Sequence, residues 1–190
     1  MPRRAVAALA LLTGVLAACG EPPIHVEIPP RQQGQQVLDL AGLLDANLAA
    51  RLQIIAERQD LDVVALTYET PTPNCGEAFR AGGAFVRRWD ADVAIVAVAE
   101  PGGFSRPVDD RRACFGVQPR DDFAVPAGVR EEIVERLAPP LTRQNRWSEA
   151  FLAAADRLAS AAKAARRELQ RPRVLRAANG RSGTAGARGR

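Results

Sequence analysis

The run DVAIVAVA at residues 92–99 constrains the fold more than any other stretch of this chain. After its first residue it contains only alanine, valine and isoleucine. A β-strand this apolar is stable when both of its faces are covered, as in the interior of a sheet that carries helices on either side. We therefore expect residues 92–99 to form a central strand with further elements packed against both faces.

Hydrophobic periodicity places the other elements around this strand. Strands are expected at residues 62–69 and 111–117, which are short and bounded by turn residues. Helices are expected from the Asp45 cap to about residue 59, and at residues 77–89, 126–141 and 147 to about 169. The pair Gly82 and Gly83 weakens the second helix by about 1 kcal/mol per residue unless a neighbour packs tightly there. This order of elements predicts an α/β fold, a small sheet with helices on both faces.

Residues 1–18 are typical of a bacterial signal peptide, with two arginines before an apolar run. The run is shorter than the about 20 residues of a membrane helix. Leu16-Ala17-Ala18-Cys19 resembles the lipobox of bacterial lipoproteins, in which the cysteine is lipidated. We therefore expect a lipid on Cys19 and a protein anchored to the membrane on its extracytoplasmic, periplasm-facing side. Gly20, in the place of an aspartate, favours the outer membrane over the inner one. The alternative is an ordinary cleaved signal peptide in which Cys19 is incidental.

The rest of the chain divides into three parts. Residues 19–36 contain two Pro-Pro pairs, which favour an extended tether, and the only histidine, His25, is expected to have no partner there. Residues 37–165 have the length of one domain. Residues 166–190 hold eight arginines and one glutamate, about +7, whereas the whole chain carries +4. We expect this basic tail to be disordered and solvated, with contact to anionic lipid as the alternative, and we expect no nucleic-acid partner.

The expected compartment predicts the oxidation state of the two remaining cysteines, Cys75 and Cys114. Exported domains are exposed to oxidising conditions, where a pair of cysteines usually forms a disulfide. Closing a loop of about 40 residues stabilises a fold by about 4 kcal/mol in the chain-entropy model. The alternative is two free thiols. Metal binding by these cysteines is not expected, because no second pair of ligands accompanies them.

Residues 37–44, VLDLAGLL, resemble the opening signature of the TPM domain family. The likeness continues with Trp89 at the end of a helix, Asp90 ahead of an apolar strand, a strand at residues 112–117, and Gln144–Trp147 before the last helix. It spans about residues 37–162. This TPM-like resemblance implies a small three-layer α/β/α sandwich with a short mixed sheet, carried outside the cytoplasm.

The resemblance also implies a site. Some plant members of the family are acid phosphatases, and some bacterial members bind divalent cations through acidic residues at the ends of the strands. Asp39 and Asp90 occupy two of those acidic positions, and Asp92 follows where the family has a glycine. These three aspartates are therefore the candidate metal site, for Ca²⁺ or Mg²⁺, at one rim of the sheet, with residues 121–122 nearby.

Other acidic positions of the family are not retained, and Gln118 stands where a glutamate is common. The residue types also allow a plain structural interpretation. Asp39 would then cap a turn, and Asp90 and Asp92 would mark the water-facing start of a strand. Three nearby arginines could bind a phosphate group or could form surface ion pairs instead. They are Arg111, Arg112 and Arg120.

Two functions are consistent with these features. The first is a non-catalytic, lipid-anchored accessory or scaffold module for another membrane or envelope protein. The alternative is a divalent-metal-dependent, acid phosphatase-like enzyme at the membrane surface.

Overall fold

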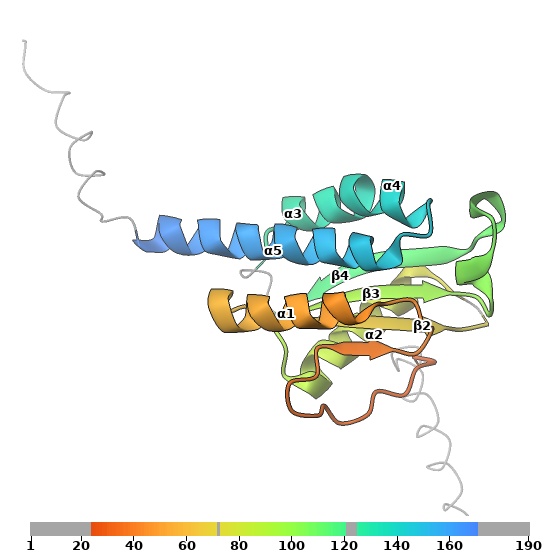
Figure 1. Ribbon diagram of the computed structural model, residues 1–190, viewed down its shortest axis with the longest axis horizontal. Helices are drawn as coiled ribbons and strands as arrows, with labels where there is room; N and C mark the ends of the chain where they lie inside the picture. Colours follow the sequence, from red (N-terminus) through yellow and green to blue (C-terminus); the bar gives the residue numbers. More distant parts are fainter. Residues whose placement is uncertain (1–23, 72, 121–124, 171–190) are drawn as a thin grey trace, which may run out of the picture.

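The computed structural model describes residues 24–71, 73–120 and 125–170 (Figure 1). The expected signal peptide, Cys19 and the basic tail beyond residue 170 lie outside the described residues. The elements, in chain order, are β1 (Val37–Asp39), α1 (Ala46–Gln59), β2 (Val63–Glu69), α2 (Cys75–Trp89), β3 (Val93–Ala99), η1 (Gly103–Ser105), η2 (Val108–Asp110), β4 (Ala113–Pro119), α3 (Ala127–Glu132), η3 (Ile133–Leu137), α4 (Ala138–Thr142) and α5 (Trp147–Gln170).

The four strands form one mixed sheet in the order β1-β2-β3-β4. β1, β2 and β3 are parallel, and β4 pairs with β3 in the antiparallel sense. Every residue of β3 is buried, which confirms the two-sided covering expected for residues 92–99. β1 was not expected as a strand, because three residues are too few to show a period of two.

One face of the sheet is covered by α1, α5 and the helical segment α3-η3-α4 (Figure 1). Leu48, Leu52 and Ile55 of α1 pack there against the long C-terminal helix. Asp45 caps α1 as expected, since its Oδ1 accepts a hydrogen bond of 3.0 Å from the backbone N–H of Leu48. The described helices include none that is both long and apolar enough to cross a lipid bilayer.

The opposite face is covered by α2 and by residues 24–36, which we call the N-terminal strap (Figure 1). α2 lies mainly over β3 and β4. A helix about 10 Å across covers two or three strands spaced about 4.8 Å apart, so the sheet needs a second cover on this side. Val26 of the strap supplies it, with Leu38, Leu66 and Tyr68 in the same apolar cluster. The expected α/β/α sandwich with a mixed sheet is therefore confirmed.

The two crossover connections have an unusual arrangement. α1 joins β1 to β2 on one face, whereas α2 joins β2 to β3 on the other. Both connections step in the same direction across parallel strands, so one of them is left-handed, against the strong preference for right-handed crossovers.

The described part of the strap does not behave as the tether expected for residues 19–36. Trp89 Nε1 donates a hydrogen bond of 2.9 Å to the carbonyl oxygen of Pro29, and the backbone N–H of His25 donates one of 3.1 Å to Glu77. The prolines keep the segment extended, but it is extended along α2 because Ile24, Val26 and Ile28 point alternate side chains at the apolar layer. The domain therefore begins before residue 37.

The C-terminal boundary also differs from the expected residue 165. α5 continues to Gln170, and Arg166 Nη2 donates a hydrogen bond of 2.8 Å to the carbonyl oxygen of Asp60. The helix expected at residues 126–141 is present but contains the wide turn η3. Pro139 and Pro140 follow this turn; they lack N–H groups and their rings clash with carbonyls four residues earlier, which explains the wider spacing.

Gly82 and Gly83 offer a matched pair of substitutions in α2. A Cβ atom on Gly82 would lie 2.9 Å from Gln118 Cβ and 3.1 Å from Val96 Cγ2, whereas on Gly83 its nearest neighbour, at 3.4 Å, is the flexible end of Arg87. We expect Gly82→Ala to lower the free energy of unfolding by about 1–3 kcal/mol and Gly83→Ala to raise it by about 0.5–1 kcal/mol. Urea denaturation measures both, and equal effects would contradict this packing.

A disulfide joins Cys75, the first residue of α2, to Cys114 of β4, with a Cα–Cα distance of 5.3 Å. The expected pairing of these cysteines is confirmed. The bond links the start of α2 to β4, over a sequence separation of 39 residues.

The double variant Cys75→Ala/Cys114→Ala should lose about 4 kcal/mol of unfolding free energy. The mass of the wild-type protein measured with and without reductant should differ by two hydrogen atoms, and an unchanged mass would show free thiols.

Candidate functional site

Asp39 lies at the end of β1 and closes the turn that leads into α1. Its Oδ1 accepts a hydrogen bond of 3.0 Å from the backbone N–H of Leu43, and its Oδ2 accepts one of 2.8 Å from Leu44. The Thr67 hydroxyl, one strand away, donates to the same carboxylate. Both oxygens therefore accept hydrogen bonds from the protein itself, and Asp39 acts as a turn cap.

Asp90 and Asp92 flank the start of β3 and share one arginine. Asp90 has a left-handed backbone and ends α2, and its side chain is 93% exposed. Arg120, just after β4, donates to Asp90 Oδ1 at 2.5 Å and to Asp92 Oδ1 at 2.8 Å. The other oxygen of Asp92 accepts a hydrogen bond of 2.9 Å from the backbone N–H of Asp62. These contacts connect the end of α2 and the start of β3 to the end of β4 and the start of β2.

The three candidate aspartates lie at opposite ends of the sheet. Asp39 is level with Thr67 of β2, which in turn is level with Ala97 of β3, whereas Asp92 precedes the first residue of β3. Five residues of strand separate the two levels, about 16 Å. A shared rim for Asp39, Asp90 and Asp92 is therefore wrong. Residues 121–122, the expected additional acids, lie outside the described residues.

The donor set at each end also fails to fit a divalent cation. Ca²⁺ takes six to eight oxygen ligands, and Mg²⁺ needs near-octahedral oxygen geometry. Within residues 24–71, 73–120 and 125–170, no three histidine, cysteine or acidic side chains converge to hold a metal ion. Moreover, a cation at Asp90 and Asp92 would have to displace the guanidinium of Arg120.

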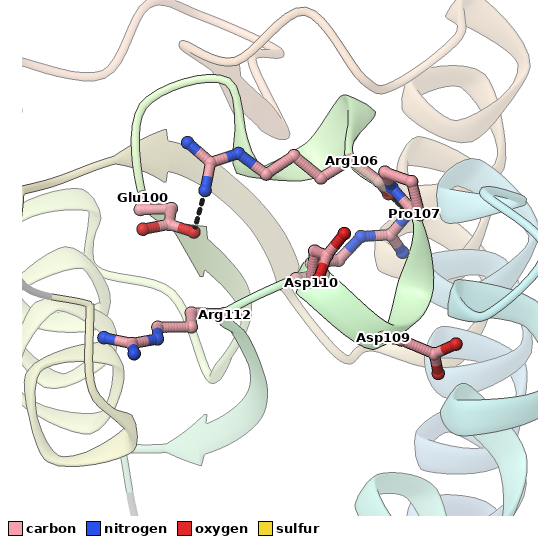
Figure 2. A pocket seen from close by; sticks show the side chains of 7 residues that line it. Glu100, Arg106, Pro107, Asp109, Asp110 and Arg112 are labelled. Atoms are coloured by element: carbon pink, nitrogen blue, oxygen red, sulfur yellow. Dashed lines mark hydrogen bonds and ion pairs between the residues drawn. The ribbon is translucent and has the colours of Figure 1, made fainter.

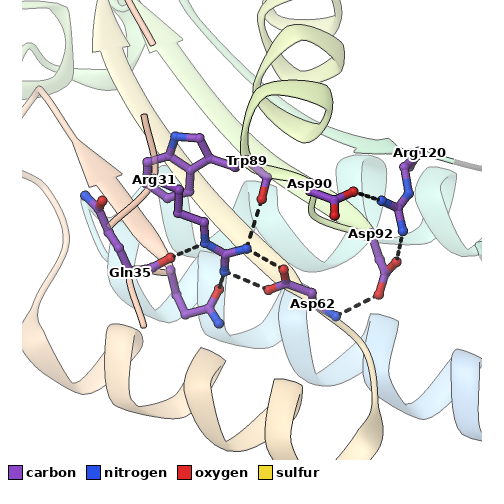
Figure 3. A network of polar contacts seen from close by, with 8 residues as sticks. Arg31, Gln35, Asp62, Trp89, Asp90, Asp92 and Arg120 are labelled. Carbon is purple, nitrogen blue, oxygen red and sulfur yellow. Dashed lines mark hydrogen bonds and ion pairs between the residues drawn. The ribbon is translucent and has the colours of Figure 1, made fainter. Parts of the chain in front are cut away.

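A second arginine extends the Asp92 contacts to the strap (Figure 3). Arg31 pairs with Asp62 in a bidentate way, with an Nη2–Oδ1 distance of 2.9 Å, and its guanidinium lies 5.6 Å from the ring centroid of Trp89. It also donates to the carbonyl oxygens of Gln35 and Trp89. Because Asp62 in turn contacts Asp92, the network connects the strap, β2, α2, β3 and the end of β4. It stabilises the fold at one edge of the sheet.

The opposite edge carries an open polar hollow of about 750 Å³ (Figure 2). It is formed by the loop between β3 and β4, which we call the 100–112 loop, and is lined by Glu100, Arg106, Pro107, Asp109, Asp110, Arg111 and Arg112. This is the edge where parallel strands end, which is where α/β proteins commonly bind ligands. Arg106 pairs with Glu100 at 2.6 Å, whereas Asp109, Asp110 and Arg112 are exposed and form no ion pair with a described residue.

Arg111 fixes the shape of this hollow. Its guanidinium donates hydrogen bonds of 2.7 Å to the carbonyl oxygens of Thr142 and Arg106, bonds the Asn145 side chain, and lies 5.5 Å from the ring centroid of Trp147. Burial lowers the pKa of Arg111 from its ordinary value. Two of the three candidate phosphate-binding arginines, Arg111 and Arg120, are thus bound to the protein itself, and Arg112 alone projects freely (Figure 2).

His25, which was expected to be without a partner, contacts a buried acid. Its Nδ1 lies 3.0 Å from Oε1 of Glu77, a side chain only 1% exposed in the first turn of α2. The Tyr68 hydroxyl is buried nearby without a hydrogen-bond partner among the described residues, and burial, with a smaller contribution from Glu77, raises the pKa of Tyr68. The alternation of apolar residues at 24, 26 and 28 was the sequence signal that this segment packs against the domain.

These side chains do not assemble a nucleophile with its general base. Among the described residues, the His25–Glu77 pair forms no hydrogen bond with a serine, threonine or cysteine, and both cysteines of the described chain are in the disulfide. The three candidate carboxylates are already engaged: Asp39 accepts backbone hydrogen bonds, and Asp90 and Asp92 pair with Arg120. What the arrangement offers chemically is a rigid hollow of mixed charge.

No family model matches the chain, and no curated protein matches it. Among solved structures, the fold is similar to the solution NMR structure of the N-terminal domain of a protein from P. gingivalis, with 17% sequence identity and a TM-score of 0.49. The similarity covers 69% of this chain and 83% of that one.

The structural role of Asp39 can be separated from a chemical one. Asp39→Ala leaves two turn N–H groups and Thr67 without their acceptor, so we expect the free energy of unfolding to fall by about 2 kcal/mol. The control Asp109→Ala removes an exposed carboxylate of the 100–112 loop and should change it by less than about 0.5 kcal/mol. Urea denaturation compares them, and a wild-type stability for Asp39→Ala would refute the capping role.

Proposed function

We propose that this protein is a non-catalytic accessory module with a TPM-like domain, held on the extracytoplasmic side of a bacterial membrane by a lipid on Cys19. It would assist or scaffold another membrane or envelope protein. The observation that carries the proposal is the use of the candidate carboxylates: Asp39 closes a turn, and Asp90 and Asp92 hold Arg120. Side chains committed to the fold in this way leave a binding role as the best-supported one.

The extracytoplasmic location is supported by the disulfide and by the sequence at the N-terminus. A Cys75–Cys114 bridge is typical of domains that fold in an oxidising compartment. The lipobox-like Leu16-Ala17-Ala18-Cys19 precedes the strap by only a few residues. Each buried methylene of an acyl chain contributes about 0.8 kcal/mol to membrane binding, so several chains hold a domain durably.

The 100–112 loop is the best-supported surface for a protein partner. Its exposed side chains include two acids, Asp109 and Asp110, an arginine that forms no ion pair with a described residue, Arg112, and an apolar side chain, Val108, which is 40% exposed. The loop has no regular strand or long helix, yet Arg111 and the Phe104–Trp147 edge contact fix its conformation. A fixed polar surface binds without the entropic cost of ordering a loop.

Catalysis provides the sharpest test against the alternative. Purified residues 20–190 should hydrolyse an aryl phosphate no faster than buffer, with or without Mg²⁺ or Ca²⁺. A metal-dependent rate that disappears in both Asp39→Ala and Asp90→Ala, with both variants shown to be folded, would favour the phosphatase instead. Glu135→Ala, which removes an exposed carboxylate from η3 rather than from the 100–112 loop, serves as the matched acidic control and should leave any such rate unchanged.

The anchor is tested separately in cells. Labelled palmitate should be incorporated at Cys19, and Cys19→Ala should abolish the label and release the protein from membranes. A Cys19→Ala protein that stays membrane-bound would contradict the lipid anchor. Photo-crosslinking from position 109 in membranes should capture a partner that is not captured from position 163, an exposed position in the C-terminal half of α5.

A further inference from the structure

A second hollow, of about 410 Å³, lies between the strap and α2. Its lining combines apolar residues with two cations: Ile24, Val26, Ile28, Ala84, Arg87 and Arg88. We call this surface the strap groove. Val26 is buried, whereas Ile24 and Ile28 are only partly buried and pack against the cluster beneath α2. The groove therefore has an apolar floor next to positive charge.

The two arginines of the strap groove are free to bind a ligand. Arg87 and Arg88 are exposed in the last turn of α2 and form no ion pair with a described residue. By contrast, Arg31 and Arg120 at the adjacent edge of the sheet are paired with aspartates. The strap contributes one exposed acid, Glu27, so positive charge is in excess here. Guanidinium groups bind phosphate oxygens with two parallel hydrogen bonds, which suits them to an anionic headgroup.

The position of the groove along the chain indicates where this ligand comes from. Only residues 20–23 separate Cys19 from Ile24, the first lining residue. A chain of five peptide units spans at most about 18 Å. Because the strap is bound to α2, only this short segment, residues 20–23, connects a lipid on Cys19 to the folded domain. The groove lies next to the point where this connecting segment joins the domain, because Ile24 is one of its lining residues.

We propose that the strap groove binds the phosphate headgroup of an anionic phospholipid in the same membrane that holds the Cys19 lipid. Arg87 and Arg88 would bind the phosphate, and the parts of Ile24 and Ile28 that the domain leaves exposed would contact the upper part of the acyl chains. This fixes the orientation of the domain, with α2 toward the bilayer. The inference rests on the proposed function only in that the anchor brings the membrane within reach.

The test uses the lipid-free chain of residues 20–190 and vesicles of phosphatidylcholine alone or mixed with phosphatidylglycerol. We expect binding to the mixed vesicles only, measured by co-sedimentation. A basic side chain near an anionic surface contributes about 1 kcal/mol, so Arg87→Gln/Arg88→Gln should weaken binding by about thirty-fold. The matched control, Arg136→Gln/Arg143→Gln, removes two exposed arginines from the other layer, one in η3 and one directly after α4, and should weaken binding by less than about threefold.

Each outcome decides the proposal. Equal losses in the two double variants would show that net charge alone, including the basic residues beyond 170, governs binding, and would overturn it. Equal binding of the wild-type chain to both kinds of vesicle, or none to either, would overturn it too. Circular dichroism checks that α2 stays folded in the variants. Palmitate labelling at Cys19 is independent of this assay, so failure of the anchor and failure of the groove are told apart.

Discussion

The two-sided burial of β3 is the constraint on which the rest of the structure depends. A strand of valine, alanine and isoleucine needs apolar cover above and below, and each fully buried side chain of this size stabilises the fold by about 1.5–3 kcal/mol. Two long helices cover one face. On the other face a single helix, α2, is too narrow for four strands, so residues 24–36 complete the layer. The strap is part of the domain for this reason, and its docking brings the proposed lipid anchor close to the domain.

Arginine–carboxylate pairs then decide what the acidic residues do. Arg31 and Arg120 hold Asp62, Asp90 and Asp92 at the edge where β2 and β3 begin (Figure 3). These pairs are partly exposed, so each contributes modestly to stability, but together they join five segments that are distant in the sequence. The same contacts supply each carboxylate with a partner of the opposite charge. An acidic side chain that meets an arginine in the fold is thereby committed to structure.

Several charged side chains that form no ion pair with a described residue lie on two other surfaces. Asp109, Asp110 and Arg112 project from the 100–112 loop, and Arg87 and Arg88 project from α2 beside the strap. The first surface lies at the edge of the sheet where α/β proteins commonly bind ligands, and the second lies where the chain enters the domain. Two such surfaces on one small domain suit a module that bridges a membrane and a partner, which is the role we propose.

The sequence by itself determined the α/β class, the central strand at residues 92–99, the N-cap at Asp45 and the pairing of Cys75 with Cys114, because each follows from local periodicity, local hydrogen bonding or a count of cysteines. The tertiary structure alone decided the opposite placement of Asp39 and Asp92, since strand register sets which end of the sheet a residue reaches. It also decided that His25 meets Glu77 and that residues 24–36 cover the sheet. Those contacts join residues about 50 positions apart, and only the packing of α2 beside an uncovered strip of sheet creates the surface that receives them.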